Sequence, residues 1–426
     1  MILDRAIQPA VYPIANLSFV TPETRTFGQT TLVEFKGGDK EVIRLRVVYE
    51  AGTKHHENPV VPAAVNSLLK EGTKKRSAAQ IADELDFYGA FLHTEINKDH
   101  AWVELYCLTK HFSKIIPVFT DILSNPVFHE DEIKVYRNNA IQKLNENFER
   151  VSFLAKNKLQ GLLFGQAHYY GAEVTEDHYH KIDSNTLSNF FKSHMFGKIA
   201  RVEIVGQFQD NELTTIIREL DLEKGHQAVT HQRKVIQTPS SHRIFIPKKE
   251  AVQSAIAIGK LMPNRTHPDF FGAKVLICVL GGYFGSRLMT NIREEKGFTY
   301  GIGAGLGSYQ EQGILSIGTE VGVQVKDEAL LEIYKEIKRL VDEEVPVNEL
   351  TLVKNYMKGS LLKQCDGIFA QVDLLHSLFP FNLDFSYYQE FIKTINHISA
   401  KQLQQLAEKY LSPTGFVEVV AGGSDN

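Results

Sequence analysis

Two kinds of apolar spacing occur along the chain, and together they predict a mixture of strands and helices. Apolar residues recur at every second position in stretches typical of half-buried strands, at 29–35, 42–49 and 101–107. They recur at every third or fourth position in stretches typical of amphipathic helices, at 60–70, 77–88 and, as a series, from 112 to about 191. Runs of strands followed by runs of helices favour an α+β fold with mostly antiparallel sheets.

The same order of elements occurs twice, which indicates an internal duplication. Shifted by roughly 216 residues, the β-branched strand at 201–206 matches a strand at 416–420. An amphipathic helix precedes each strand, and a Pro-Val step opens a long helix in each half, at 126–133 and 345–350. The sequence therefore predicts two duplicated domains, each a mostly antiparallel sheet packed with helices. Their limits are 1–222 and 243–426, joined by a polar linker at 223–242.

One segment of the first half combines a helix, a Gly-Thr turn and a Lys-Arg-Ser helix start, the turn running from Gly72 to Ser77. It resembles the inverted-zincin peptidases of the pitrilysin/insulinase family, whose first helix reads His-x-x-Glu-His. In such a helix two imidazoles four residues apart bind zinc on one face, and the carboxylate deprotonates the bound water. Counted back from Gly72, the resemblance puts these three positions at Ala63, Asn66 and Ser67.

The remaining zinc position is altered as well. The family's further glutamate, about 75 residues downstream, falls at or next to Lys143, and its supporting carboxylate falls at Tyr136. Alanine has no donor atom, and a lysine ammonium repels a divalent cation. We therefore expect neither zinc nor any other cofactor to be bound by this chain.

The second half carries an unbroken motif from Val279 to Tyr300 that resembles the second-domain motif of the same family. Its glycines predict a tight turn into a helix beginning near residue 286, with a strand following at 298–304; they are Gly281, Gly282 and Gly285. We expect this turn to bring Arg293 and Tyr300 close enough to point into one cavity. Both side chains donate hydrogen bonds suited to an oxyanion on a peptide carbonyl. The alternative is a surface ion pair of Arg293 with Glu294 or Glu295, and a Tyr300 packed in the sheet.

Composition and charge narrow the possible function classes. A net charge of −4, with acidic and basic residues interspersed, argues against a nucleic-acid-binding face. There is no run of about 18 apolar residues to span a membrane, and residues 1–9 do not read as a secretory signal. Three widely spaced cysteines, Cys107, Cys278 and Cys365, fit a reducing compartment. We expect a cytoplasmic protein, or a periplasmic one if a signal has been removed.

Two hypotheses of different class follow. In the first, the chain is the non-zinc subunit of a heterodimeric zinc peptidase: it binds extended peptide and supplies Arg293 and Tyr300 to a zinc-bearing subunit of the same family. This is what the resemblance to heterodimeric bacterial members implies. In the second, it is a non-enzymatic scaffold or a peptide-binding homodimer of the same fold. The retained pair distinguishes them, because a scaffold has no physical reason to keep both residues at catalytic spacing.

Overall fold

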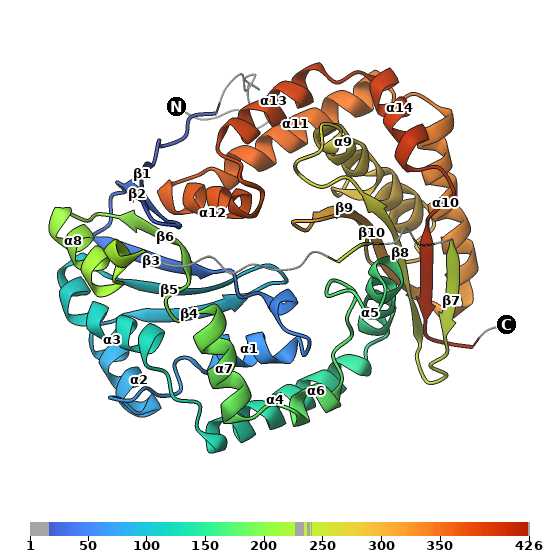
Figure 1. Cartoon of the computed structure of the whole chain (residues 1–426). Coiled ribbons are helices and arrows are strands. Elements are labelled where there is room, and N and C mark those ends of the chain that lie inside the picture. The colour runs from blue at the N-terminus through green and yellow to red at the C-terminus, as the bar shows by residue number, and fades with distance from the viewer. Residues whose placement is uncertain (1–16, 226–233, 237–238, 240, 425–426) are drawn as a thin grey trace, which may run out of the picture.

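The computed structural model describes residues 17–225, 234–236, 239 and 241–424, which form two mixed sheets covered by helices (Figure 1). The first sheet has the strand order β1-β2-β6-β3-β5-β4. Its β2/β6 pair is parallel and its other pairs are antiparallel. The strands are Glu23–Phe27 (β1), Thr30–Lys36 (β2), Val42–Tyr49 (β3), Phe91–Ile96 (β4), Ala101–Leu108 (β5) and Ile199–Gly206 (β6).

The second sheet repeats this topology with the order β7-β11-β8-β10-β9. In each half the last strand lies parallel to the first main strand and antiparallel to the second, as β6 does with β2 and β3, and β11 with β7 and β8. This confirms the α+β fold of two duplicated, mostly antiparallel units. The strands are His242–Ile246 (β7), Gln253–Met262 (β8), Ile302–Ser308 (β9), Gly313–Gly322 (β10) and Val417–Ala421 (β11).

Helices pack on both sheets, and each half has its own main apolar core. In the first half they are Val60–Leu68 (α1), Ala78–Phe87 (α2), Phe112–Ser124 (α3), Glu130–Phe148 (α4), Val151–Phe164 (α5), Glu176–His180 (α6), Ser184–His194 (α7) and Asp210–Glu219 (α8). In the second they are Phe270–Gly281 (α9), Lys326–Asp342 (α10), Val347–Gln364 (α11), Ile368–Leu378 (α12), Ser386–His397 (α13) and Ala400–Tyr410 (α14), with a π-helix at Met289–Glu295 (η4). Among the described helices, none has the length and apolar character needed to cross a bilayer.

Local pattern predicts these elements well but not completely. Strand β3 has the predicted bounds, β2 is shifted by one residue at both ends, and β5 is one residue longer than predicted. The helical series after residue 112 divides into five helices, α3 to α7. The edge strands β1 and β4 were not predicted. Much of the expected linker at 223–242 lies outside the described residues, as do residues 1–9.

The two halves exchange one helix each. Helix α5 belongs to the first half but packs on β8 and β11 of the second sheet, and α12 belongs to the second half but packs on β6 of the first (Figure 1). The α5 contact is apolar and close: a Cβ added at Gly259 of β8 would lie 2.8 Å from Cδ1 of Leu163 and 3.1 Å from Cδ2 of Leu159. Each half therefore supplies a helix that packs on the sheet of the other half.

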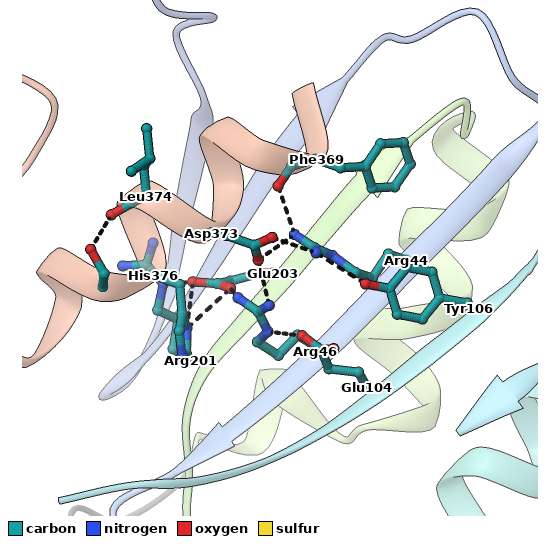
Figure 2. A network of polar contacts seen from close by, with 11 residues as sticks. Arg44, Arg46, Glu104, Tyr106, Arg201, Glu203, Phe369, Asp373, Leu374 and His376 are labelled. Atoms are coloured by element: carbon teal, nitrogen blue, oxygen red, sulfur yellow. Dashed lines mark hydrogen bonds and ion pairs between the residues drawn. The ribbon is translucent and has the colours of Figure 1, made fainter. Parts of the chain in front are cut away.

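The α12 contact combines an apolar cluster, in which Ile368, Val372 and Leu375 pack on the first sheet, with a network of charged side chains (Figure 2). Asp373 of α12 accepts hydrogen bonds from Arg44 Nη1 at 3.1 Å and Arg46 Nη2 at 2.6 Å, both on β3. Arg46 also donates Nη1 to Glu203 of β6 at 2.8 Å and Nε to Glu104 of β5. The two arginines are almost fully buried, so these partners are what make their charges tolerable there.

Glu203 is the anionic centre of this network. It is 1% exposed and accepts from Arg201 Nε at 2.7 Å, while His376 Nδ1 of α12 lies 3.3 Å from its carboxylate. Burial pushes the pKa of Glu203 upward, but neighbouring His376 and Arg201 outweigh it and hold the pKa well below its ordinary value. The ionised carboxylate therefore stabilises the closed contact between the halves.

Candidate functional site

The first candidate site is the helix at which the family resemblance places the zinc ligands. Ala63 and Ser67 lie one turn apart on α1 and therefore on one face. Asn66 is buried, and its Nδ2 donates to the backbone oxygen of Glu95 on β4 at 2.8 Å. The amide thus binds the neighbouring strand, and Ala63 offers no donor atom at all.

The predicted downstream position does come together with this helix. Lys143 of α4 and Ser67 line one hollow of about 580 Å³, with Tyr136 on the same α4 face. Burial raises the pKa of Tyr136, so its phenol stays neutral. In the part of the chain that the structure describes, no group of three or more His, Cys, Asp and Glu side chains is arranged to hold a metal ion. Besides Lys143, Ser67 and Tyr136, the hollow is lined by the carboxylates of Glu71 and Glu132 but by no imidazole or thiolate, so it lacks the ligand set that a zinc site requires.

The turn after α1 is held firmly, which explains why its sequence is recognisable although the ligands are replaced. Thr73 Oγ1 donates to Asp121 Oδ2 at 2.7 Å, and Arg76 Nη1 donates to the same oxygen at 2.8 Å. Burial raises the pKa of Asp121, but these hydrogen bonds, led by that of Thr73, lower it below its ordinary value. Ser77 caps α2 through a reciprocal capping box with Gln80.

The second candidate site is the glycine-rich turn after α9. A Cβ at Gly281 would lie 2.6 Å from the backbone nitrogen of Ala304, and one at Gly282 would lie 2.6 Å from Cα of Cys278. Added at Gly285, a Cβ would lie 2.9 Å from the ring of Tyr283. The close approaches at Gly281 and Gly282 are to backbone atoms, so packing requires glycine at these two positions, whereas the contact at Gly285 is with a side chain that can shift.

The helix and strand after this turn differ from prediction in two respects. The helix begins next to Ser286, as expected, but its Met289–Glu295 portion is wound as a π-helix. The strand expected at 298–304 begins only at Ile302, so Tyr300 lies in the bend before β9 and not on the strand. Gly297, at φ +65°, ends the helix as predicted. The wider π turn and the late strand start leave 298–301 free of the sheet ladder.

Arg293 and Tyr300 are presented differently from both alternatives drawn from the sequence. The guanidinium of Arg293 lies over the Phe284 ring, with Cζ 4.5 Å from the ring centroid, and it forms no ion pair with any described residue. Tyr300 is 95% exposed and is not packed in the sheet. It borders a hollow between α5 and the second sheet, which Arg293 does not line. That the two side chains serve one reaction centre stays a prediction.

Hydrogen bonds to α10 and α11 hold the helical segment that leads to Arg293 and Tyr300. Arg287 donates Nε and Nη2 to the two carboxylate oxygens of Glu349, each at 2.9 Å. Asn291 donates Nδ2 to Glu332 and to Glu336, each at 2.8 Å. Bidentate and charge-assisted hydrogen bonds of this kind fix orientation as well as position. The helix that precedes the exposed Tyr300 is therefore held in a fixed orientation.

A third feature is a cavity of about 640 Å³ between the halves. Ala63 of α1, Trp102 of β5 and Tyr179 of α6 line it from the first half, and Tyr309 and Phe379 from the second. His100 also borders it, and burial lowers the pKa of this imidazole to about 4, so it is neutral at neutral pH. Charged side chains, among them Lys98, Asp99 and Arg265, line other parts of this chamber.

Comparison with known proteins agrees with the geometry. A model described as Insulinase (Peptidase family M16) matches residues 61–166, and one described as Peptidase M16 inactive domain matches residues 181–357, so together they span more than half of the chain. The chain belongs to the insulinase family.

Relatives and solved structures of this family are distant in sequence but similar in extent. The "Uncharacterized zinc protease YmxG" of Bacillus subtilis is 22% identical, covering 72% of this chain and 75% of the relative. The "Non-peptidase homolog YmxG" of Helicobacter pylori is 22% identical, covering 80% of each. A Pseudomonas fluorescens structure titled peptidase M16 inactive domain superposes with a TM-score of 0.86 at 20% identity, covering 95% of this chain and 98% of that one. At this identity the likeness establishes the fold.

Within this insulinase-family chain, sequence reasoning located the two motif regions but missed the network around Glu203. Arg44 and Arg46 alternate with apolar residues on β3 and so read as solvent-facing positions. Their partner Asp373 is more than 300 residues away along the chain. The one available signal was two arginines on a strand in which every neighbour is buried.

Proposed function

We propose that this insulinase-family chain is the non-zinc subunit of a two-chain metallopeptidase, and that it binds extended peptide and supplies Arg293 and Tyr300 to the zinc site of its partner. The exposure of Tyr300 is the observation that carries the proposal. A tyrosine that is 95% exposed, seven residues after a half-buried arginine, gains nothing for the stability of this chain. The exposure of Tyr300 is explained if a second chain covers this side chain in the complex.

The chemistry of the pair supports this role. A guanidinium and a phenol donate hydrogen bonds to an oxyanion as it develops on a peptide carbonyl. Hydrolysis also requires an activated water, and the positions of α1 that correspond to zinc ligands carry no suitable donors. Zinc and water activation therefore belong to the partner, a zinc-bearing member of the same family. The Helicobacter pylori relative, named a non-peptidase homolog, supports a chain without peptidase activity of its own.

The substrate proposed is a peptide or unfolded segment in extended form. Strand β4 is an edge of the first sheet, and its residues alternate between exposed and half-buried. Its last residue, Ile96, borders the chamber between the halves. A peptide added along such an edge binds mainly through its backbone, which gives affinity with broad sequence tolerance.

The domain limits and the compartment belong to the same proposal. We take 1–222 and 243–426 as the two domains, because the described strands of each sheet fall within one of these ranges, except that β7 begins one residue earlier, at His242. The cysteines Cys107, Cys278 and Cys365 are all buried thiols, which suits a cytoplasmic protein.

The decisive experiment is reconstitution with a family member that has an intact His-x-x-Glu-His helix. Peptide cleavage is measured for the partner alone and with this chain, first unaltered and then as Arg293→Ala and Tyr300→Phe. Loss of an oxyanion donor lowers kcat by about 100-fold or more, so we expect both variants to retain binding to the partner but to lose most of the gained activity. Arg218→Ala on α8, which pairs only with neighbouring Glu219, is the matched control and should be fully active.

Two outcomes would contradict the proposal. Unchanged activity of both variants in an assembled complex removes the shared site. A chain that pairs only with itself in size-exclusion chromatography, whatever partner is offered, favours a peptide-binding homodimer or scaffold instead.

A further inference from the structure

A hollow of about 600 Å³ in the second half contains two cationic side chains and no free acidic group. It lies among α9, α11, α12 and α13, and its walls are largely apolar and aromatic, including Ile277, Leu374, Tyr387 and Phe391. This size is typical of a pocket for a small organic ligand. It is separate from the hollow beside Ser67 and from the turn that carries Tyr300.

The first cation is Lys274 of α9. It is the one charged residue in the otherwise apolar Phe270–Gly281 helix. Its Nζ lies 4.7 Å from the centroid of the Phe391 ring, and it forms no ion pair within the residues that the structure describes. The side chain is accessible from the hollow but surrounded by protein, and this burial, followed by the charge of nearby Arg265, lowers its pKa to about 8.

The second cation, Arg265, is held in place at one end only. Its Nη1 donates to the backbone oxygen of Ser377 at 2.7 Å and to Oγ of the same residue at 3.0 Å. Its Nε and Nη2 make no hydrogen bond to any described residue, which leaves two donors for a ligand. Arg265 and Ser377 also line the chamber between the halves, so the two spaces adjoin at this point.

The only carboxylate that borders the hollow is committed elsewhere. Asp373 accepts hydrogen bonds from Arg44 and Arg46 on the first sheet (Figure 2). Two cations that share a cavity repel each other, and an anion bound between them offsets this repulsion and stabilises the charged form of both. A guanidinium with free donors beside a lysine is an arrangement suited to a carboxylate.

We propose that this hollow binds a carboxylate attached to an apolar or aromatic body, with the carboxylate between Arg265 and Lys274 and the body against Tyr387 and Phe391. The ligand is either the C-terminal residue of a peptide or a free carboxylic acid of similar shape. The proposal goes beyond the role of Arg293 and Tyr300, and only the peptide source rests on the proposed function. A peptide that leaves the chamber past Ser377 would place its C-terminus here.

The test is isothermal titration of the whole chain with two matched pairs of probes. One pair is N-acetylphenylalanine and its amide, and the other is a hexapeptide ending in phenylalanine, as the free acid and as the C-terminal amide. Loss of a charge-assisted contact weakens binding by about tenfold or more, so we expect at least one acid to bind about tenfold more tightly than its amide. Preference for the short acid alone identifies a free acid as the source, and preference for the peptide acid identifies a peptide terminus. If neither acid is preferred over its amide, the proposal is wrong.

Lys274→Met should abolish the preference for the acid, whereas the matched control Lys401→Met, on the exposed face of α14, should keep it. Because Lys274→Met could lower stability, the pH profile of the unaltered chain provides a second measurement. Affinity for the acid should be constant below pH 8 and fall above it as Lys274 loses its proton. Burial raises the pKa of Cys278 to about 12 and also raises those of Tyr387 and Tyr388, so these three groups do not account for a change near pH 8. A flat profile to pH 9.5 would exclude Lys274 from the site. Since no partner subunit is present, failure here leaves the shared peptidase site untouched.

Discussion

The two sheets share the order of five strands, with β1 as an additional edge strand of the first, yet the helices that cross between the halves contact them differently. Helix α5 makes an apolar contact, whereas α12 adds an ion-pair network to an apolar one. Gly206 and Gly422 provide a common reference point, because they follow the last strand of each half at φ +128° and +111°. An added Cβ would meet a backbone oxygen in both places, that of Val42 at 1.9 Å and that of Gln253 at 2.4 Å. Counting from these glycines along the strand registers therefore aligns the two sheets residue by residue.

On the face that receives the crossing helix, charged residues of the first sheet correspond to small or apolar residues of the second. On the second main strand, Arg44 and Arg46 correspond to Ala255 and Ala257. On the last strand, Arg201 and Glu203 correspond to Val417 and Val419. On the next strand, Glu104 corresponds to Gly318. Helix α12 accordingly brings Asp373 and His376, and α5 brings Ala155 and Leu159. The comparison teaches that topology fixes where a crossing helix lies but leaves the chemistry of its contact open. An apolar contact tolerates gradual change, whereas an ion-pair network stabilises only while it is complete.

The largest effect is expected from placing the first sheet's charge in the second sheet. Val419 is fully buried against α5, so Val419→Glu introduces a carboxylate with no cation among its apolar neighbours. We expect the free energy of unfolding to fall by about 4 kcal/mol or more, measured by urea denaturation followed by circular dichroism. Val252→Glu, at an 83% exposed position just before β8, should change it by less than about 0.5 kcal/mol. A tolerated Val419→Glu would show that the α5 contact is not a dry interface.

The reverse experiment removes the central charge of the first sheet. Glu203→Gln leaves Arg46 and Arg201 buried without their common carboxylate, and we expect a loss of about 3 kcal/mol. Trp102, the one tryptophan of the chain, has its ring 5.0 Å from that of His376 and reports on this contact by fluorescence. Glu418→Gln is the matched control on β11. The ion-pair partner of Glu418, Arg243, is exposed, and burial raises the pKa of Glu418. We therefore expect the free energy of unfolding to change by less than about 1 kcal/mol. Equal losses in the two variants would contradict the contrast between the sheets.

The smallest effect is the dependence of stability on pH. The pKa of Glu203 lies below its value in the unfolded chain, so the unfolded state takes up a proton first as the pH falls. Its stabilisation is complete above pH 5, declines below about pH 4.5, and is reduced by about 1 kcal/mol at pH 4. Burial raises the pKa of Glu418, so acidification affects that residue with the opposite sign. The unaltered chain should lose more stability than Glu203→Gln between pH 6 and pH 4, and parallel curves for the two would remove Glu203 as the source.

The sequence predicts those parts of the molecule that are set by local pattern. The alternation at 42–49 and the helix start at Ser77 predict elements that the structure contains, and the duplication predicts two similar, mostly antiparallel units but not the order of their strands. Edge strand β4 escaped prediction because its burial alternates only between exposed and half-buried, so its apolar pattern is weak. The late start of β9 escaped because the π-helix before it changes the phase of the following residues.

The sequence did not reveal which elements far apart along the chain contact each other. The apolar side of α5 would suit either sheet, and its spacing says nothing about a contact with β8 and β11. Ser67 and Lys143 line one hollow because α1 and α4 pack together within one half, and their assignment as former zinc positions stays a prediction. Lys274 was overlooked, although a single charge within an apolar helix is a usable signal of a lined cavity.

The order in which the crossing helices are made during synthesis differs between the halves. Residues of α5 precede the whole second sheet, so an apolar lid is ready when that sheet forms. The first sheet is complete at Gly206, but its lid begins only at Ile368, and meanwhile its face must stand in water. Arginines and glutamates hydrate well and resist aggregation, whereas an open valine face would attract other nascent chains. The charged residues of the first sheet thus protect the growing polypeptide from aggregation until α12 has been made and packs on this sheet.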